Sequence, residues 1–149
     1  MPRSHRTELR ARLLELCEEF RAHGDIACEA ALAESHMRFA EDVSAVVFRT
    51  VRELLANVRR HARAKHVKVT SERRRDGSIG ITVADDGIGL PPHKRRGKPR
   101  DENYGNGGSG LWIIDRRLRD FGAMLDIDAT AGQGTRAMVI LPAALVVGD

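Results

Sequence analysis

The sequence predicts an α/β (α+β) fold, a two-layer sandwich of about three helices on a mixed five-stranded sheet. Three segments carry apolar residues at three- and four-residue spacing, which is typical of amphipathic helices. Other segments alternate apolar and polar residues with period two, and two of them are joined by a hairpin signal instead of a helix. The 149 residues fit one domain with a real core, so we expect residues 1–149 to form a single domain.

Each of the three predicted helices has one apolar stripe. The first covers residues 8–20 and can end at Gly24, the second is long, and the third ends at Gly122. The stripes consist of Leu9, Leu13, Leu16, Cys17 and Phe20 in the first helix, Val43, Val47, Val51, Leu54, Leu55, Val58 and Ala62 in the second, and Leu111, Ile114, Leu118 and Phe121 in the third.

Two of the predicted strands form a hairpin. A strand that begins at Val67 turns at Asp76-Gly77 into a strand that ends at Asp85. The other three predicted strands cover residues 25–32, 125–128 and 135–141. In the first of these, the inward-facing set is Ile26, Cys28, Ala30 and Leu32.

The charge of the chain favours an anionic partner. The net charge is +4, and the basic residues concentrate in two clusters. Polyphosphate is a simpler anion than nucleic acid here, because one Trp, one Tyr and four Phe offer no stacking platform and no nucleic-acid motif is found. We therefore expect no direct contact with nucleic acid. The clusters are Lys94, Arg95, Arg96, Lys98 and Arg100, and Arg59, Arg60, Arg63 and Lys65.

The two cysteines, Cys17 and Cys28, lie on the apolar phase of their segments. This pattern is typical of small core residues in a reducing compartment. No run approaches the ~18 apolar residues of a membrane span, and the first residues do not resemble a signal peptide. We expect a cytoplasmic chain.

Asp85 stands at the end of a strand whose inward residues are Ile79, Ile81 and Val83, so period two places its carboxylate on the same face. An unpaired buried charge is costly, and a carboxylate at this position therefore needs a donor such as the amino group of adenine. The alternative is that Asp85 caps an ordinary Asp-Gly turn.

The long helix carries Glu53, Asn57, Arg60 and His61 on one polar face. Magnesium prefers oxygen ligands, so the amide oxygen of Asn57 together with triphosphate oxygens can form its ligand set. Glu53 can orient or deprotonate a nucleophile. The alternative is a solvent-exposed face with an ordinary ion pair.

Four glycines precede the third helix, whose free N–H groups and positive end favour anions. A flexible linker is the alternative for such a cluster. The order of the features is more specific: an amide-bearing helix, a strand ending in D-x-G-x-G, a long loop, and G-x-G-L opening a helix. The loop, residues 89–108, is expected to be mobile and functional. The glycines are Gly105, Gly107, Gly108 and Gly110.

Three segments resemble the N box and the two glycine boxes of the ATP-binding catalytic domain of bacterial sensor histidine kinases, in the GHKL superfamily with gyrase-type ATPases. They are RELLANVRRHARA (52–64), VADDGIGL (83–90) and GSGLWIIDRRLRDFGA (108–123). The closing GQGTRAMVILP also matches. The resemblance covers about residues 9–142 and implies a Bergerat-type ATP-binding fold with a long ATP lid at about 90–107. Arg60-His61 most resembles the kinases that pair with helix-turn-helix response regulators.

The resemblance also implies roles for individual residues, with ATP and Mg²⁺ as cofactors. Glu53 would be the catalytic base or polarising residue, and Asn57 the magnesium ligand, with Glu53 reaching the metal through water. Asp85 would accept the adenine amino group, and Thr135 would assist through water. The other expected ATP-binding residues are Arg60, His61, Gly87, Ile88, Gly89, Gly108, Ser109, Gly110 and Leu111.

By this resemblance the chain is one half of a kinase. It would donate the γ-phosphoryl group of Mg-ATP to a histidine on a separate dimerisation domain, which then supplies a response regulator. None of the six histidines is followed by the acidic residue expected beside a phosphoacceptor, so we expect an excised catalytic domain. The full-length protein is expected to be a homodimer whose missing domains can associate with a membrane.

Two features depart from the pattern. The lid segment has no clear phenylalanine box, and its KRRGKPR run is unusually basic. The alternative that stays open is a complete small protein, a serine kinase and anti-sigma factor of the same superfamily.

Overall fold

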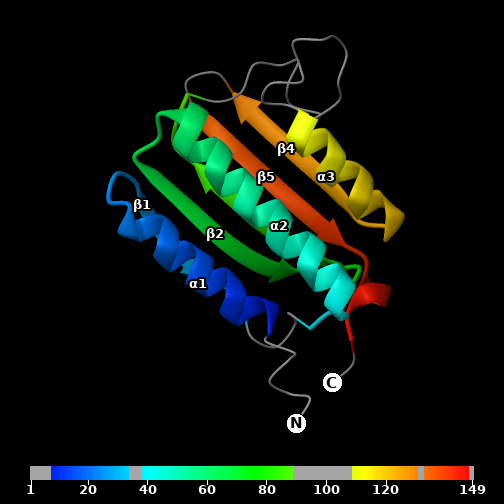
Figure 1. Ribbon diagram of the computed structural model, residues 1–149. Helices are drawn as coiled ribbons and strands as arrows, with labels where there is room; N and C mark the ends of the chain where they lie inside the picture. Colours follow the sequence, from blue (N-terminus) through cyan, green and yellow to red (C-terminus); the bar gives the residue numbers. More distant parts are fainter. Residues whose placement is uncertain (1–7, 34–37, 89–108, 131–132, 148–149) are drawn as a thin grey trace.

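Three helices lie side by side over one face of a five-stranded sheet, in the part of the chain that the structure describes (Figure 1). The structure is a computed structural model, and it describes residues 8–33, 38–88, 109–130 and 133–147. The helices are α1 (Leu9–Ala22), α2 (Glu41–Asn57) and α3 (Ser109–Asp120). This arrangement confirms the predicted two-layer fold.

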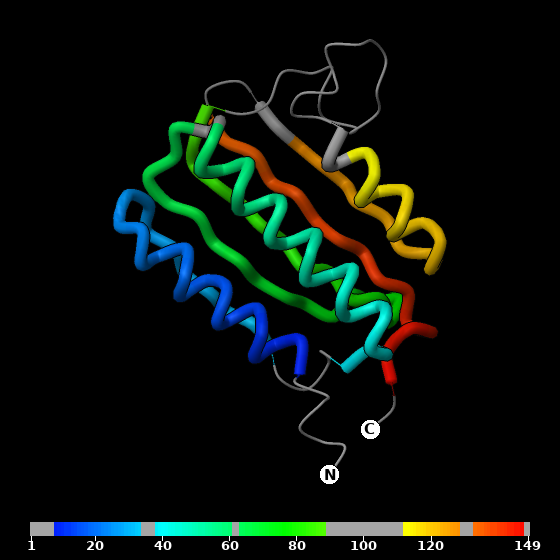
Figure 2. Tube along the Cα trace, viewed as in Figure 1, coloured from blue at the N-terminus to red at the C-terminus, as the bar shows by residue number. Residues whose placement is uncertain are grey.

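The sheet is mixed, as predicted. Its strand order is β1-β2-β3-β5-β4, in which β1 pairs with β2 in parallel and all other neighbours are antiparallel. Figure 2 shows how β5 runs between β3 and β4, although β4 precedes it in the chain. The strands are β1 (Ala27–Ala31), β2 (His66–Arg73), β3 (Ile79–Asp85), β4 (Met124–Thr130) and β5 (Gly134–Leu141).

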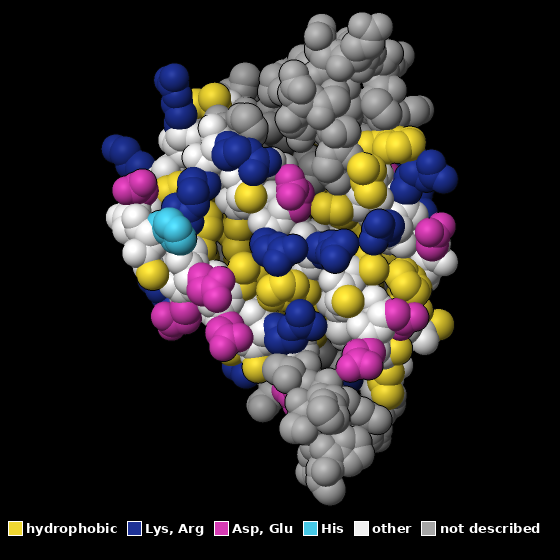
Figure 3. Space-filling model, in the orientation of Figure 1, with side chains coloured by type: hydrophobic (Ala, Val, Ile, Leu, Met, Phe, Trp, Pro, Cys, Tyr) yellow, Lys and Arg dark blue, Asp and Glu magenta, His cyan; other side chains and the backbone are white. Residues whose placement is uncertain are grey.

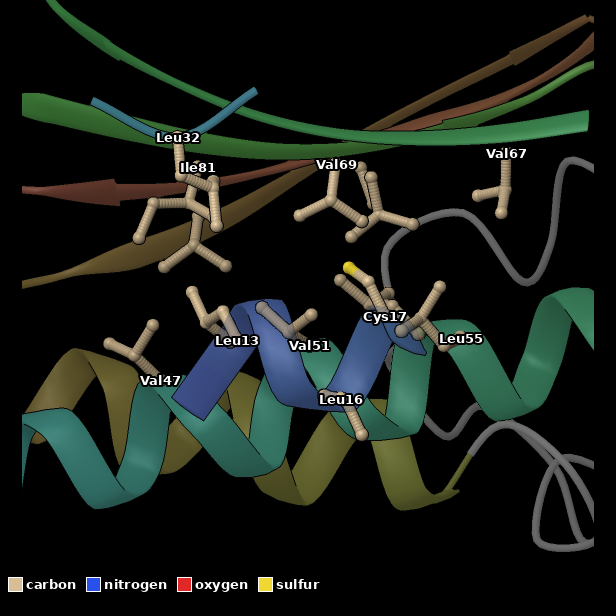
Figure 4. Packing of buried hydrophobic residues seen from close by; sticks show 14 of the residues in the cluster. Leu13, Leu16, Cys17, Leu32, Val47, Val51, Leu55, Val67, Val69 and Ile81 are labelled. Atoms are coloured by element: carbon tan, nitrogen blue, oxygen red, sulfur yellow. The ribbon is translucent and has the colours of Figure 1, made fainter. Parts of the chain in front are cut away.

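The apolar stripes of the helices cover the inner face of the sheet. Every described position of the predicted stripes is buried except Phe121, which is half-buried. Complete burial of one such side chain contributes about 1.5–3 kcal/mol, so these stripes are the main source of stability. Figure 4 shows side chains of α1 and α2 pointing toward those of the sheet: Leu13, Cys17, Val47, Val51 and Leu55 opposite Val69 and Ile81.

The predicted short strand and the two cysteines also behave as expected. Ile26, Cys28 and Leu32 are buried and Ala30 is half-buried. Cys17 and Cys28 are free thiols in the core. Among the described residues, none of the helices combines the length and the apolar character needed to cross a membrane.

The hairpin between β2 and β3 forms where Asp76-Gly77 predicts it. Gly77 has a φ of +88°, which a glycine adopts without strain. Asp76 Oδ1 accepts hydrogen bonds from the backbone N–H of Ser78 at 2.9 Å and from its hydroxyl at 2.6 Å. This turn is therefore satisfied by its own residues.

The second helix differs from its prediction at the C-terminal end. The sequence indicates one continuous helix to Ala62, but α2 ends at Asn57 and continues as a π-helix over Val58–Ala62. Arg63 follows with a left-handed φ of 54°. Single π-helical turns are rare in proteins, but where they occur they are often found at functional sites.

One further difference concerns β3. Thr82 alternates with the inward residues Ile81 and Val83 and so belongs to the outward face by period two, yet Thr82 is only 5% exposed. β3 is flanked by β2 and β5 on both edges, and at neighbouring Gly80 a Cβ would lie 3.1 Å from the sulfur of Met138. The side chains of neighbouring strands, such as Met138, therefore shield this part of β3 on the face away from the helices.

Candidate functional site

The predicted site residues gather at one end of the molecule. Figure 1 shows that the C-terminal ends of α2 and β3 lie at the same end as the beginnings of α3 and β5. This proximity follows from the antiparallel pairing of β3 with β5, which places Asp85 directly opposite Thr135. Residues far apart in the sequence therefore meet here.

Asp85 lies half-buried at this end of β3. Its Oδ1 accepts a hydrogen bond of 2.7 Å from the backbone N–H of Gly87. Burial raises the pKa of Asp85 above its ordinary value, although hydrogen bonds from the backbone N–H groups of Gly87 and Thr135 act in the opposite direction. The partial burial of Asp85 agrees with the position that the alternation of β3 predicts for it.

Thr135 presents a buried hydroxyl beside Asp85. Its Oγ1 has no hydrogen-bond partner among the described residues. An unpaired buried hydroxyl costs about 1–3 kcal/mol, so native proteins rarely keep one without a reason. An orphaned oxygen next to a carboxylate of raised pKa is typical of a site that awaits a polar ligand.

Gly134 permits the close approach of β5 to β3. Its φ is +94°, and a Cβ at this position would overlap the carbonyl oxygen of Asp85. Any other residue would therefore push the two strands apart at the point where Asp85 faces Thr135. The sequence pattern contains this glycine, but only the strand register reveals what it does.

Arg60 connects the polar residues of the long helix. Its Nη2 donates to Asn57 Oδ1 at 2.8 Å and contacts Glu53 Oε2 at 3.3 Å. Glu53 and Arg60 have side-chain exposures of 31% and 50%, so the ion pair is open to solvent and contributes little stability. The structure thus brings three of the four predicted residues together, while the side chain of His61 is outside what it describes.

Asp86, which follows Asp85, is not among the predicted site residues but makes contacts with a distant segment. Its Oδ1 accepts from the backbone N–H groups of Lys65 and His66 at 2.8 and 2.9 Å, and its Oδ2 lies 2.8 Å from His66 Nδ1. These hydrogen bonds lower the pKa of Asp86 from its ordinary value to about 2, and the bonds from His66 have the largest effect. The second acidic residue of the DDG motif was the only sequence signal.

The remaining predicted residues are described to different extents. Gly87 is buried, and the side chain of Ile88 is 48% exposed. Ser109, Gly110 and Leu111 form the first turn of α3, although nothing is described of their side chains. The predictions for Gly89, Gly108 and the lid at about 90–107 lie outside the described residues.

A buried carboxylate fixes α3 against the edge of the sheet. Asp115 accepts hydrogen bonds from Arg119 Nε at 3.0 Å and from the backbone N–H of Leu125 in β4 at 3.4 Å. This contact ties the middle of α3 to the start of β4. The helical stripe of the sequence does not reveal it.

Comparison with known proteins identifies relatives of this arrangement. Residues 42–145 match the family model described as histidine kinase-, DNA gyrase B-, and HSP90-like ATPase. A relative described as an uncharacterized sensor-like histidine kinase of Chloroflexus aurantiacus is 30% identical over 112 residues, which cover 71% of this chain and 17% of the relative. The chain therefore spans a small part of that protein.

Two solved structures share the fold. The histidine kinase domain of the blue-light activated histidine kinase EL346 of Erythrobacter litoralis has a TM-score of 0.73 at 19% identity, covering 92% of this chain and 62% of that chain. Full-length ShkA in complex with AMPPNP has a TM-score of 0.70 at 21% identity, covering 90% and 29%. At these identities the likeness establishes the fold, and the fold prediction is confirmed.

Proposed function

This chain belongs to the family of histidine kinase-, DNA gyrase B-, and HSP90-like ATPases, and we propose that it binds ATP with Mg²⁺ and donates the γ-phosphoryl group to a histidine on a separate dimerisation domain. The family description names ATPases, whose substrate is ATP, and the relative from Chloroflexus aurantiacus is described as a sensor-like histidine kinase. The acceptor domain and the response regulator that follows it are part of the proposal, because the chain spans only 17% of the relative from Chloroflexus aurantiacus.

The observation that carries the proposal is the orphaned hydroxyl of Thr135 beside the carboxylate of Asp85. Adenine offers an amino group as donor to Asp85, and a water between the base and Thr135 would satisfy the hydroxyl. Guanine carries a carbonyl oxygen where adenine has this amino group, so it would leave the carboxylate facing an acceptor. The pair therefore favours ATP over GTP.

The other end of the nucleotide would meet the polar face of α2. A single cationic nitrogen of Arg60 contacts oxygens of both Asn57 and Glu53, so these oxygens already face one positive charge. Oxygen donors of this kind fit Mg²⁺, with Asn57 as the protein ligand and triphosphate oxygens as the others. When bound, the metal would supply charge neutralisation to the triphosphate.

Besides the metal, residues of this chain would bind the phosphates and orient the reacting groups. Arg60 would exchange Asn57 for phosphate oxygens, and the first turn of α3 from Ser109 would add N–H donors for them. Glu53 would orient the acceptor histidine and hold its proton during transfer. Such a division agrees with phosphoryl transfer as a reaction catalysed mainly by positioning and electrostatics.

Radiolabelled ATP tests the proposal. The isolated chain should show negligible label on histidine, and addition of a dimerisation domain bearing the acceptor histidine should give acid-labile label on that domain. Label that accumulates on the isolated chain would contradict a separate acceptor. Acid-stable label on an added serine substrate would favour the serine kinase and anti-sigma alternative.

A further inference from the structure

The carboxylate of Asp86 joins two segments of the chain that carry the proposed site. It accepts from the backbone N–H groups of Lys65 and His66, and it hydrogen bonds to the ring of His66. In return, the N–H of Asp86 donates to the carbonyl of His66 at 3.2 Å. We call this set of contacts between Asp86, Lys65 and His66 the Asp86 clamp.

On one side, the clamp holds the chain that leaves α2. Lys65 follows the π-helix Val58–Ala62 and the left-handed Arg63. Its carbonyl accepts from the N–H of Ala27 at 3.0 Å, so the same residue is also anchored to β1. The irregular turn that carries Arg60 is thereby fixed at its downstream end.

On the other side, the clamp holds the turn that contains Asp85. Asp86 lies between Asp85 and Gly87, whose N–H donates to the Asp85 carboxylate. The β2–β3 ladder ends at the pair Val67 and Asp85, so the clamp extends strand pairing by one residue beyond the ladder. The position of Asp85 relative to the end of α2 depends on this connection.

We propose that Asp86 is a positioning residue that sets the spacing between Asp85 and the polar end of α2, so that one nucleotide can reach both. The inference rests on the proposed function, because it assigns the adenine to Asp85 and the phosphates to the end of α2. A ligand held at two points gains affinity when their spacing is fixed beforehand. A ligand that touches one point gains nothing from it.

Asp76 shows that a turn-capping aspartate need not have this role. It also accepts two hydrogen bonds through one oxygen, at the opposite end of β3, but its partner Ser78 is two residues away. Asp86 instead bonds residues that are 20 and 21 positions away. Asp76 is therefore a useful control: it accepts two hydrogen bonds through one oxygen as Asp86 does, but its partner belongs to its own turn.

The test compares Asp86→Ala with Asp76→Ala on three ligands: Mg-ATP, adenosine and inorganic tripolyphosphate with Mg²⁺. We expect Asp86→Ala to weaken Mg-ATP binding about tenfold, the loss typical of residues that orient a site from behind it, and to change the two half-ligands less than about twofold. Asp76→Ala should lose stability yet bind all three ligands as the wild type does. Calorimetry for ATP and NMR titration for the half-ligands measure these affinities.

A conservative variant separates positioning from charge. Asp86→Asn keeps an oxygen for the N–H groups of Lys65 and His66, so it should recover most of the ATP affinity. If Asp86→Ala does not fold, His66→Ala removes only the Oδ2 contact, and an ATP-selective loss of about two- to threefold is expected.

Equal losses of affinity for all three ligands in Asp86→Ala would overturn the positioning role. Equal affinities in the Asp86→Ala and Asp76→Ala variants would overturn it too. If His66→Ala has to replace Asp86→Ala, an unchanged ATP affinity in His66→Ala has the same meaning. A wild-type chain that binds no Mg-ATP gives a different result. It would refute the proposed function itself, and this inference with it.

Discussion

The two ends of β3 differ in how completely their polar groups are satisfied. At the hairpin end, Asp76 bonds within its own turn, and Gly77 takes the left-handed conformation that glycine tolerates. At the other end, Thr135 has no partner among the described residues, the pKa of Asp85 is raised, and Arg63 adopts a left-handed φ without being glycine.

This difference indicates where the chain retains strain and unsatisfied groups. Non-glycine residues with left-handed φ, and buried polar atoms without partners, persist only where the surrounding structure enforces them. Figure 3 shows that Lys and Arg side chains gather near the centre of the face that carries the helices. Two arginines of the helices, Arg12 of α1 and Arg52 of α2, lie over the ring of Phe48 at 4.4 and 5.7 Å.

The largest expected effect comes from Gly134. Gly134→Ala adds a Cβ that overlaps the Asp85 carbonyl at a positive φ, so we expect it to lower the free energy of unfolding by about 2–5 kcal/mol. Gly24→Ala is the control, because Gly24 has a similar φ of +87° but no atom within 4 Å of the added Cβ. Its loss should be about 1–2 kcal/mol. Urea unfolding of both variants measures the difference, and equal losses would mean that β5 tolerates the displacement.

Asp85 should come next. Asp85→Ala removes the acceptor for the adenine amino group, and we expect a loss of about 10–100-fold in ATP affinity, with the preference over GTP gone. Asp85→Asn should lose affinity too, yet raise the melting temperature of the free domain at neutral pH, because it removes a charge that burial disfavours. Thermal shift and calorimetry with both nucleotides test this. An unchanged nucleotide preference would remove Asp85 from the site.

Glu53 and Asn57 should separate, although Arg60 contacts both. Asn57→Ala removes the proposed metal ligand, so Mg²⁺-dependent ATP affinity should fall about tenfold. Glu53→Ala should spare affinity and abolish phosphoryl transfer. Calorimetry with and without Mg²⁺ compares the two variants, and identical losses would contradict these assignments.

The smallest effect concerns acid. The folded pKa of Asp85 is raised, so its ionisation opposes folding; this penalty is absent below its unfolded pKa and complete once the pH rises through the folded value. The folded pKa of Asp86 is lowered to about 2, so its contribution is present above its unfolded value of ~3.9 and is lost as the pH falls toward 2. Asp85→Asn and Asp86→Asn should therefore differ from the wild type in opposite directions at neutral pH. Both changes in stability should shrink on acidification. Unfolding measured across the acid range tests this. If both variants change stability in the same direction at neutral pH, the assignments are wrong.

Most of the fold could be predicted because its signals are local. The stripes of α1 and α2 and the Asp76-Gly77 hairpin each follow from the spacing of a few neighbouring residues. The end of α2 could not be predicted in this way. Val58 and Ala62 continue the helical spacing, yet the chain turns into a π-helix there and then meets the distant carboxylate of Asp86.

In the candidate site, too, the features set by neighbouring residues could be predicted and those set by distant contacts could not. Asp85 and the polar face of Glu53, Asn57 and Arg60 are visible from period and spacing within one element. Thr135 is expected from the resemblance, but its pairing with Asp85 is visible only in the register of β3 with β5. The contacts of Gly134 and Asp86 depend on which residues face each other across strands or loops, and the sequence pattern does not reveal them. Their roles in nucleotide binding stay predictions.

The strand order also has a consequence for how the chain reaches its native state. β5 is made after β4 but lies between β4 and β3, so during synthesis β3 and β4 each present an unpaired backbone edge until β5 inserts. Contacts between distant segments of this kind form late and leave nascent edges open to other chains. Because Asp85 meets Thr135 only through that insertion, a chain that stops before it can possess most of its helices and still lack the pairing of Asp85 with Thr135.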